Sequence, residues 1–289
     1  MTRPRLAEAP AAVREAVKEL LGARVQTEQP AQGGFTPSIA SVVVGRGSRL
    51  FVKAAPLGMG VEVGAALAEA VGEIGPRLVG FRVVGDWRVA AYEVIEGAAV
   101  RQWAAEDVPR LLSLIDRWRV RAAACRVNGA TPYADAFRPM LGAWQGSAVP
   151  GPPLPVSIAL PVLAELERRW LSVLRPGTAL HHGDLRRDNF MREPDGRLRI
   201  VDWTHLWTAP GWMDLVRLLP DVAACGFDPE ELLRRSCWAD APAEDVNVAL
   251  AGLAGRAWRD GHRPGDPALR RMQREQAYQL LGWLASRVP

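Results

Sequence analysis

The chain has 289 residues, 48% of them hydrophobic and 24% charged, which is typical of a globular protein that buries a substantial core. Its formal net charge of +4 is small for this length, and because its basic residues are spread along the chain we expect no nucleic-acid partner. Three cysteines without a Cys-x-x-Cys spacing, and the lack of any apolar run of about 18 residues, predict a reduced cytoplasmic protein with no membrane partner.

Strand patterns dominate the first 96 residues. A helical pattern runs from about Val61 to Ile74 and stops at Pro76. Apolar segments bounded by glycine-containing turns indicate four strands, over residues 38–45, 48–55, 79–84 and 87–97. We therefore predict a small, mostly antiparallel sheet with one internal helix.

Helical periodicity dominates from residue 100 onward. The strongest patterns cover residues 106–125, 162–174, 212–225 and 269–288. Residues 146–161 hold five prolines and are expected to connect two of these helices. The predicted fold class is α+β, with a β-rich lobe over residues 1–96, a larger helical lobe over residues 97–289, and a cleft between them.

Lysine is rare in this chain. Among 36 basic residues only Lys18 and Lys53 are lysines, and the two side-chain types differ in charge geometry and hydration. Lys18 falls in an amphipathic helical pattern, where a solvated charge is ordinary. Lys53 falls among apolar residues of a predicted strand, so it is the candidate cation for a nucleotide phosphate. A carboxylate of the nearby helix, Glu62 or Glu69, would hold it in place.

Residues 181–190, HHGDLRRDNF, precede a strand–turn–strand pattern and form the candidate reaction centre. A two-residue Asp195-Gly196 loop is the favoured connection of that hairpin, and its register sets Asn189 opposite Asp202. Opposed side chains lie about 4.5–5.5 Å apart at Cβ, which brings an amide oxygen and a carboxylate together. Such a pair suits Mg²⁺ when phosphate oxygens and water complete its octahedron.

Asp184 lies five residues before Asn189. It can be near the metal without binding it, which suits a group that orients an incoming hydroxyl and accepts its proton. The other interpretation of this segment is a solvated charged turn. The glycine-rich residues 32–38 give weaker support, because Gly33 and Gly34 let N–H groups approach a phosphate but also suit a plain turn. The sequence contains no Walker A loop and no GxSxG elbow.

Two motifs resemble a known family. HGDLRRDN at 182–189, followed by IVDW at 200–203, is similar to the HGDxxxxN and IDW signatures of aminoglycoside phosphotransferases and choline-kinase-like enzymes, small-molecule relatives of the protein kinases. The resemblance covers most of the chain, through GGFTPS, FVK at 51–53, YEVIEG at 92–97 and APGWMDL at 209–215. It implies a two-lobed protein-kinase-like fold, with a nucleotide-binding lobe over 1–96 and a catalytic, acceptor-binding lobe over 97–289.

The resemblance also implies catalytic roles. Asp184 would be the base, and Asn189 and Asp202 would bind Mg²⁺. Arg186, two positions after the base, would either touch the γ-phosphate or face solvent. Two further residues would brace this loop, namely His182 and Asp214.

Nucleotide contacts follow from the same resemblance. Lys53 would hold the α- and β-phosphates of ATP, with GTP as the alternative, and Glu62 is favoured over Glu69 as its partner. The remaining contacts would come from Gly33, Gly34, Thr36 and Ser38 and from the backbone of Glu93, Val94 and Ile95, which would bind the base.

The sequence leaves the acceptor open. Eleven residues separate Asp202 from Asp214, too few for a protein-kinase activation segment, so we expect a small-molecule hydroxyl acceptor. Residues 255–289 carry seven arginines, which argues against a polycation. The alternatives are a resistance enzyme for an aminoglycoside, nucleoside or macrolide antibiotic, a metabolite kinase of the choline or homoserine type, and a nucleotide-binding pseudokinase regulator, as a monomer or homodimer.

Overall fold

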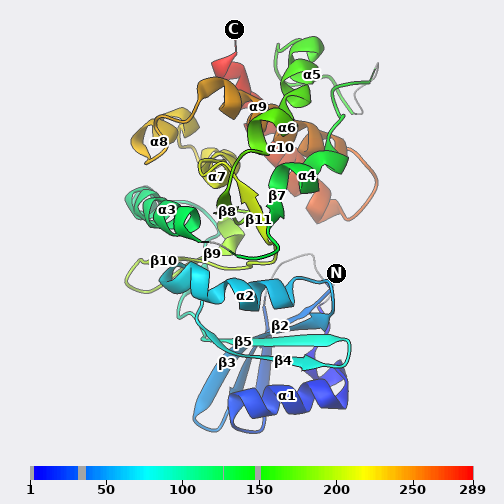
Figure 1. Ribbon diagram of the computed structural model, residues 1–289, viewed down its shortest axis with the longest axis vertical. Helices are drawn as coiled ribbons and strands as arrows, with labels where there is room; N and C mark the ends of the chain where they lie inside the picture. Colours follow the sequence, from blue (N-terminus) through cyan, green and yellow to red (C-terminus); the bar gives the residue numbers. More distant parts are fainter. Residues whose placement is uncertain (1–2, 32–36, 126, 147–150, 289) are drawn as a thin grey trace. The chain divides into compact units, whose positions relative to one another are not determined.

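The computed structural model describes residues 3–31, 37–125, 127–146 and 151–288. The chain forms two compact units (Figure 1). One boundary at residue 96 is expected, but the chain leaves the first unit after Val100 and later returns to it. A strand that follows residue 188 pairs there with strand β6 (Ala98–Ala99). The first unit comprises Met1–Val100 and Asp188–His205, and the second comprises Arg101–Arg187 and Leu206–Pro289.

A five-stranded antiparallel sheet in the order β1-β2-β3-β5-β4 is the base of the first unit. Four of its strands confirm the predictions, although β5 ends at Tyr92 where the predicted strand extended to residue 97. The edge strand β1 has the sequence TEQP, which carries no apolar pattern and was not predicted. The strands are β1 (Thr27–Pro30), β2 (Ile39–Gly45), β3 (Ser48–Pro56), β4 (Leu78–Val84) and β5 (Trp87–Tyr92).

Two helices cover opposite faces of this sheet (Figure 1). They are α1 (Ala11–Leu21) and α2 (Val61–Val71), and short 3-10 turns flank them at Leu6–Glu8 and Gly72–Ile74. Val17 of α1 shares a core cluster with Val52, whereas Val61 of α2 shares one with Ala90. Successive strand residues point to opposite faces, and Lys53 pairs with Ala90, so Lys53 lies on the face covered by α2.

The hairpin after the candidate reaction centre belongs to a second sheet of this unit. Its strands are β9 (Phe190–Arg192) and β10 (Leu198–Ile200), and β9 also pairs with β6. All pairs are antiparallel, in the order β10-β9-β6.

The register of this hairpin corrects the prediction by one residue. The N–H of Val201 donates to the carbonyl oxygen of Asn189 at 2.9 Å, so Asn189 faces Val201 and not Asp202. The reason is the loop, which has the three residues 194–196 where two were expected. Gly196 ends it with a φ of 83°, the left-handed conformation that closes a three-residue hairpin loop.

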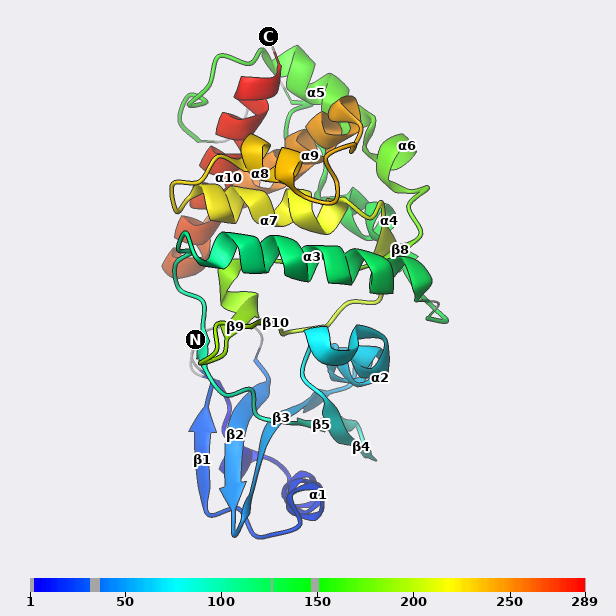
Figure 2. The ribbon, with the colours of Figure 1, turned by 90° about the vertical axis from the view of Figure 1, so that its left-hand side faces the viewer.

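The second unit is mainly helical. Figure 2 shows α3 and α7 running alongside one another, and Trp118 of α3 donates to Asp214 of α7 at 3.0 Å. A small sheet has the order β7-β11-β8, with β7 (Thr131–Pro132), β11 (Trp207–Ala209) and β8 (Ala179–His181). The α-helices are α3 (Asp107–Ala124), α4 (Tyr133–Phe137), α5 (Leu160–Arg168), α6 (Trp170–Leu174), α7 (Met213–Ala223), α8 (Pro229–Arg235), α9 (Ala243–Gly261) and α10 (Pro267–Arg287).

The predicted helices correspond to α3, α5 with α6, α7 and α10, whereas α9 was missed. This helix packs against α5, α6, α7 and α10 and is buried on nearly all sides. Its segment VNVALAGLAG at 246–255 therefore shows no one-sided apolar pattern. None of the helices in the described part of the chain is long and apolar enough to cross a membrane.

Candidate active site

Lys53 and Asp202 form an ion pair within the first unit. Lys53 reaches out from β3 on the α2 face, and Asp202 follows two residues after the end of β10. The side chain of Lys53 is 18% exposed and that of Asp202 is 47% exposed. Asp202 has a φ of 68°, and it is the one non-glycine residue in the described ranges with a positive φ. Strained backbone of this kind concentrates at functional sites, because the surrounding fold must hold it in place.

Glu62 does not hold Lys53, which corrects the predicted pairing. Its Oε1 accepts a hydrogen bond from the N–H of Gly58 at 3.4 Å, and its Oε2 is buried without a hydrogen-bond partner. Glu69 is exposed and makes no ion pair with Lys53 either, among the residues that the structure describes. Asp202 is the carboxylate that neutralises Lys53. The orphaned oxygen of Glu62 nevertheless marks a place where a donor fits.

The segment that follows β5 has backbone N–H and C=O groups without hydrogen-bond partners among the described residues. The N–H of Glu93 donates to the carbonyl oxygen of Arg77 at 3.0 Å, and its carboxylate accepts from Arg199 at 2.8 Å. Val94 and Ile95 make no backbone hydrogen bond within the described residues. The edge of a purine base carries hydrogen-bond donors and acceptors, so adjacent backbone N–H and C=O groups that lack partners can bind it.

Of the four loop residues predicted to contact the nucleotide, only Ser38 lies within the described chain, since Gly33, Gly34 and Thr36 lie outside it. Ser38 is buried at the start of β2, and its hydroxyl accepts a hydrogen bond from Arg3 at 3.4 Å. The described contacts of Ser38 therefore tie β2 to the N-terminal segment.

Asp214, in the first turn of α7, braces the loop that carries Asp184. Its side chain is buried. Burial acts to raise its pKa, but the charge and hydrogen bond of His181 outweigh burial, and the pKa of Asp214 lies well below its ordinary value. The carboxylate accepts from the backbone N–H of His182 at 2.9 Å and of Gly183 at 3.1 Å, from the indole N–H of Trp118 at 3.0 Å, and lies 2.9 Å from Nδ1 of His181.

Asp184 lies among cationic groups in the second unit. Its carboxylate accepts a hydrogen bond from Arg217 at 2.8 Å and lies 3.8 Å from Arg186. Its own N–H donates to Nδ1 of His182 at 3.2 Å, so His182 fixes the backbone here. Burial acts to raise the pKa of Asp184, but Arg217 and Arg186 outweigh burial and hold the pKa below its ordinary value. Asp184 is therefore ionised at neutral pH, as a proton acceptor must be.

The side chain of Arg186 does not face solvent, which was one of its two predicted alternatives, and its contact with a γ-phosphate stays a prediction. Its side chain is 13% exposed and donates to the sulfur of Met272 in α10 at 3.2 Å. Arg217 was missed by the sequence analysis. The available signal was one cation in the apolar run LVRLL at 215–219 of a predicted helix.

The oxygen donors of the first unit fit Mg²⁺ better than a softer metal. Asn189 is buried, and its carbonyl oxygen accepts a hydrogen bond from the N–H of Val201, the residue directly before Asp202. One amide oxygen and one carboxylate leave most positions of an octahedron to phosphate and water, as Mg²⁺ prefers. Within the described residues no cluster of three His, Cys, Asp or Glu side chains could hold a metal ion by itself.

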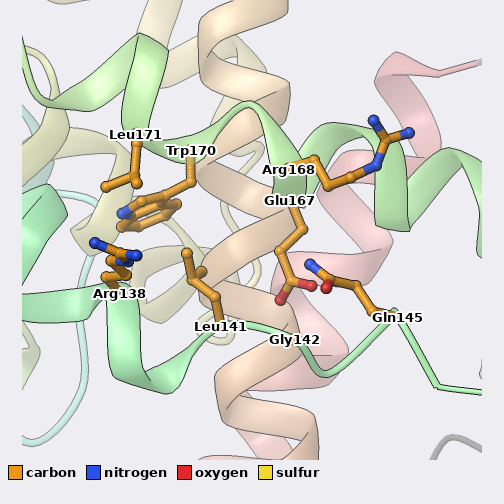
Figure 3. A pocket seen from close by; sticks show the side chains of 8 residues that line it. All are labelled: Arg138, Leu141, Gly142, Gln145, Glu167, Arg168, Trp170 and Leu171. Carbon is orange, nitrogen blue, oxygen red and sulfur yellow. The ribbon is translucent and has the colours of Figure 1, made fainter.

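A pocket of about 320 Å³ in the second unit is lined by none of these residues (Figure 3). Within it, Glu167 and Gln145 point toward one another, and burial raises the pKa of Glu167. The pocket lining consists of Arg138, Leu141, Gly142, Gln145, Glu167, Arg168, Trp170 and Leu171.

Solved structures similar to this chain are small-molecule kinases. An aminoglycoside phosphotransferase from Alicyclobacillus acidocaldarius subsp. acidocaldarius DSM 446 is 16% identical, with 98% of this chain and 97% of that chain covered and a TM-score of 0.63. The choline kinase LicA from Streptococcus pneumoniae is 15% identical, with 95% and 98% covered and a TM-score of 0.61. A thermostable mutant of aminoglycoside phosphotransferase APH(4)-Ia, in a ternary complex with AMP-PNP and hygromycin B, is 12% identical, with 96% and 98% covered and a TM-score of 0.64.

No protein-family model and no curated protein matches the chain. At these identities the structural likeness establishes the fold. The chain has the α+β, protein-kinase-like fold of aminoglycoside phosphotransferases and choline kinase, which confirms the fold class and the resemblance that its motifs indicate.

Proposed function

We propose that this protein is a Mg²⁺-dependent phosphotransferase that moves the γ-phosphate of ATP or GTP to the hydroxyl of a small molecule. The observation that carries this proposal is Asp184, held ionised on a loop that Asp214 braces, in a chain with the fold of small-molecule kinases. Lys53 and Asp202, which form an ion pair in the first unit, are the phosphate-binding cation and a candidate metal ligand.

Each residue has a chemical role in this reaction. The acceptor oxygen forms a bond to the γ-phosphorus while the bond to the oxygen that bridges the β- and γ-phosphates breaks, so the products are a phosphate ester and ADP or GDP. Asp184 orients the hydroxyl and receives its proton. Lys53 contacts the α- and β-phosphates. Mg²⁺, held by Asn189 and Asp202, would neutralise charge on the phosphate oxygens.

Nucleotide recognition is assigned to the segment after β5. Glu93, Val94 and Ile95 would bind the purine through their backbone, since Val94 and Ile95 keep these groups unused among the described contacts. We further propose that the enzyme acts in the cytoplasm, where nucleotide and Mg²⁺ are plentiful, and needs neither nucleic acid nor a membrane.

The test is Asp184→Asn. We expect phosphoryl transfer to fall by about 100-fold or more, because the proton acceptor is lost, while the dissociation constant of Mg²⁺ with ATP changes by less than about threefold. Asp188→Asn is the matched control, since Asp188 lies four residues away and is exposed. Wild-type turnover in Asp184→Asn would contradict the assignment of the base. Wild-type protein that binds nucleotide but transfers to no acceptor would instead be a regulator.

A further inference from the structure

Five arginines gather around Asp184 and Asp260 in the second unit. Arg217 and Arg186 lie 2.8 and 3.8 Å from Asp184. Three more share Asp260 of α9, and we call all five the arginine cluster. These three are Arg256 at 3.4 Å, Arg259 at 3.1 Å and Arg263 at 3.9 Å.

The two halves of the arginine cluster interact. Burial lowers the pKa of Arg256, and the charge of Arg217 lowers it further, while Asp184 and Asp260 act in the other direction. Tyr133 joins the two halves, because its hydroxyl lies 3.4 Å from Arg217 and its pKa responds to both arginines. The pKa of Tyr133 is raised, chiefly by burial, so its hydroxyl is neutral and cannot balance their charge.

The charges of the arginine cluster are not balanced. In these ion pairs five guanidinium groups share two carboxylates; Arg263 is 58% exposed to solvent, and the four less exposed groups carry an excess of two positive charges. Asp214 does not offset this excess, since it is bound by His181 and the loop. Only 10% of the Arg217 side chain is exposed. Among the described residues, the Nε atom of Arg217 is buried without an acceptor, and that of Arg256 makes no hydrogen bond although it lies 3.4 Å from the carboxylate of Asp260.

A buried excess of like charge is unfavourable unless an anion relieves it. Guanidinium groups bind carboxylate and phosphate oxygens in a planar, two-point geometry. Within the described chain, Arg217 keeps a donor atom without a partner, while Arg256 makes no hydrogen bond and contacts Asp260 through its Nε atom. A polycation would add repulsion to this region. A neutral acceptor would leave the excess charge in place.

We infer that the acceptor is an anionic hydroxylated small molecule, whose carboxylate or phosphate group is bound by Arg217 and Arg256 while its hydroxyl faces Asp184. This inference rests on the proposed function, since it names the substrate class of the same reaction. It also sets this chain apart from the aminoglycoside phosphotransferases that share its fold, because their polycationic acceptors carry the opposite charge.

The test uses acceptors matched in all but charge. Glycerate and glycerol 3-phosphate are compared with glycerol, and fructose 6-phosphate with fructose, while hygromycin B and kanamycin form the cationic arm. The readouts are the release of ADP above the rate without acceptor, and the thermal shift that each compound produces without nucleotide. We expect both responses in the carboxylate arm, the phosphate arm or both, and neither response from the neutral and cationic compounds.

A matched pair of variants separates local recognition from overall charge. Arg256→Gln removes a cation that pairs with an acidic residue four positions away in its helix, and Arg235→Gln removes a cation from the exposed pair with Glu231, also four positions away. We expect Arg256→Gln to raise the KM for the responding anion about tenfold or more with kcat changed less than about threefold, and Arg235→Gln to change neither.

The possible results distinguish this inference from the proposed function. Transfer to the neutral or cationic arm without a response from the anionic arms would overturn the inference and leave the kinase assignment standing. An anion response that is equal in Arg256→Gln and wild type would also overturn it. A chain without a Mg²⁺-dependent thermal shift with ATP or GTP would overturn the proposed function, while an anion shift that Arg256→Gln abolishes would still support the anion site.

Discussion

At the scale of single residues, Arg217 decides how Asp184 behaves. A cation at 2.8 Å keeps the carboxylate ionised, but the same low pKa makes it a weaker base. Without Arg217 the pKa of Asp184 would rise, because burial would be opposed chiefly by Arg186. The contact with Arg217 therefore keeps the Asp184 carboxylate charged over the whole neutral range, and at the same time makes it a weaker base.

Arg217→Met tests this balance. In the proposed reaction Asp184 must be ionised, so the acid limb of kcat/KM is expected to follow the pKa of this carboxyl. We expect that limb to move to higher pH by about 1–3 pH units, the usual effect of removing an adjacent opposite charge. The measurement is kcat/KM from about pH 4 to 8, with Arg235→Met as the control. An unmoved limb would show that another group limits activity in acid.

Asp214 is the residue on which the loop depends. Because its pKa is held below the ordinary value, its stabilisation is fully present above the pKa of an unfolded aspartate and is lost only as the pH falls through the lower folded value. In Asp214→Asn an amide would face the donors that now bind a carboxylate. We expect a loss of about 3–5 kcal/mol in the free energy of unfolding at pH 7, measured with urea.

The control for that loss is Asp240→Asn, at an exposed position, which we expect to stay within about 0.5 kcal/mol of wild type. The difference between Asp214→Asn and wild type is expected to be constant through neutral pH and to shrink only in strong acid. A difference that shrinks already at neutral pH would mean that a group other than Asp214 carries the effect.

At the scale of elements, the sequence predicts what local patterns encode. The strands on both sides of Gly85 and the helix α7 follow from periodicity and turn residues. The hairpin β9–β10 also follows, but its register depends on whether its loop has two or three residues, and the sequence Pro-Asp-Gly suits both. A shift of the strand register by one residue places Asn189 opposite Val201 instead of Asp202.

Tertiary packing determines what the sequence did not reveal. The helix α9 is buried all round, so its apolar residues follow no period. The contact between Asp184 and Arg217 joins a loop to a helix that begins 29 residues later in the chain, and no local rule relates them. The ion pair of Lys53 with Asp202 likewise spans 149 positions. Motifs therefore identified the candidate site residues, but not the partners that tune them.

Gly97 links β6 to the hairpin and gives a test at this scale. It has a φ of 141°, and a Cβ atom there would lie 2.1 Å from the carbonyl oxygen of Arg192 in β9. Gly97→Ala must therefore push β6 away from β9. We expect a loss of at least about 2 kcal/mol in the free energy of unfolding, measured with urea.

Gly85→Ala is the control for Gly97→Ala. Gly85 also has a positive φ, of 55°, but nothing lies within 4 Å of an added Cβ. It should cost about 1 kcal/mol, from backbone strain alone. Equal losses in the two variants would show that conformational strain, and not the approach of β6 to β9, sets the cost at Gly97.

At the scale of the whole molecule, the first unit is discontinuous in sequence. Its second segment, Asp188–His205, supplies β9, β10 and Asp202. It also supplies Trp203, whose indole nitrogen lies 3.1 Å from the position that a Cβ of Gly75 would take. Residues 1–100 alone would therefore lack part of their core and the partner of Lys53.

The ends of the two segments lie side by side, since the N–H of Val100 donates to the carbonyl oxygen of Phe190 at 2.9 Å. A Gly-Ser linker of about five residues is therefore enough to join residue 100 to residue 188 at little cost in loop closure. We expect the fusion of 1–100 with 188–205 to unfold cooperatively in urea, followed by circular dichroism, and the fragment 1–100 to show no cooperative transition. The same fusion with Trp203→Ala should unfold at lower urea, because a buried side chain is lost. If 1–100 alone unfolds with the midpoint of the fusion, the segment 188–205 is an appendage of the first unit and not part of its core.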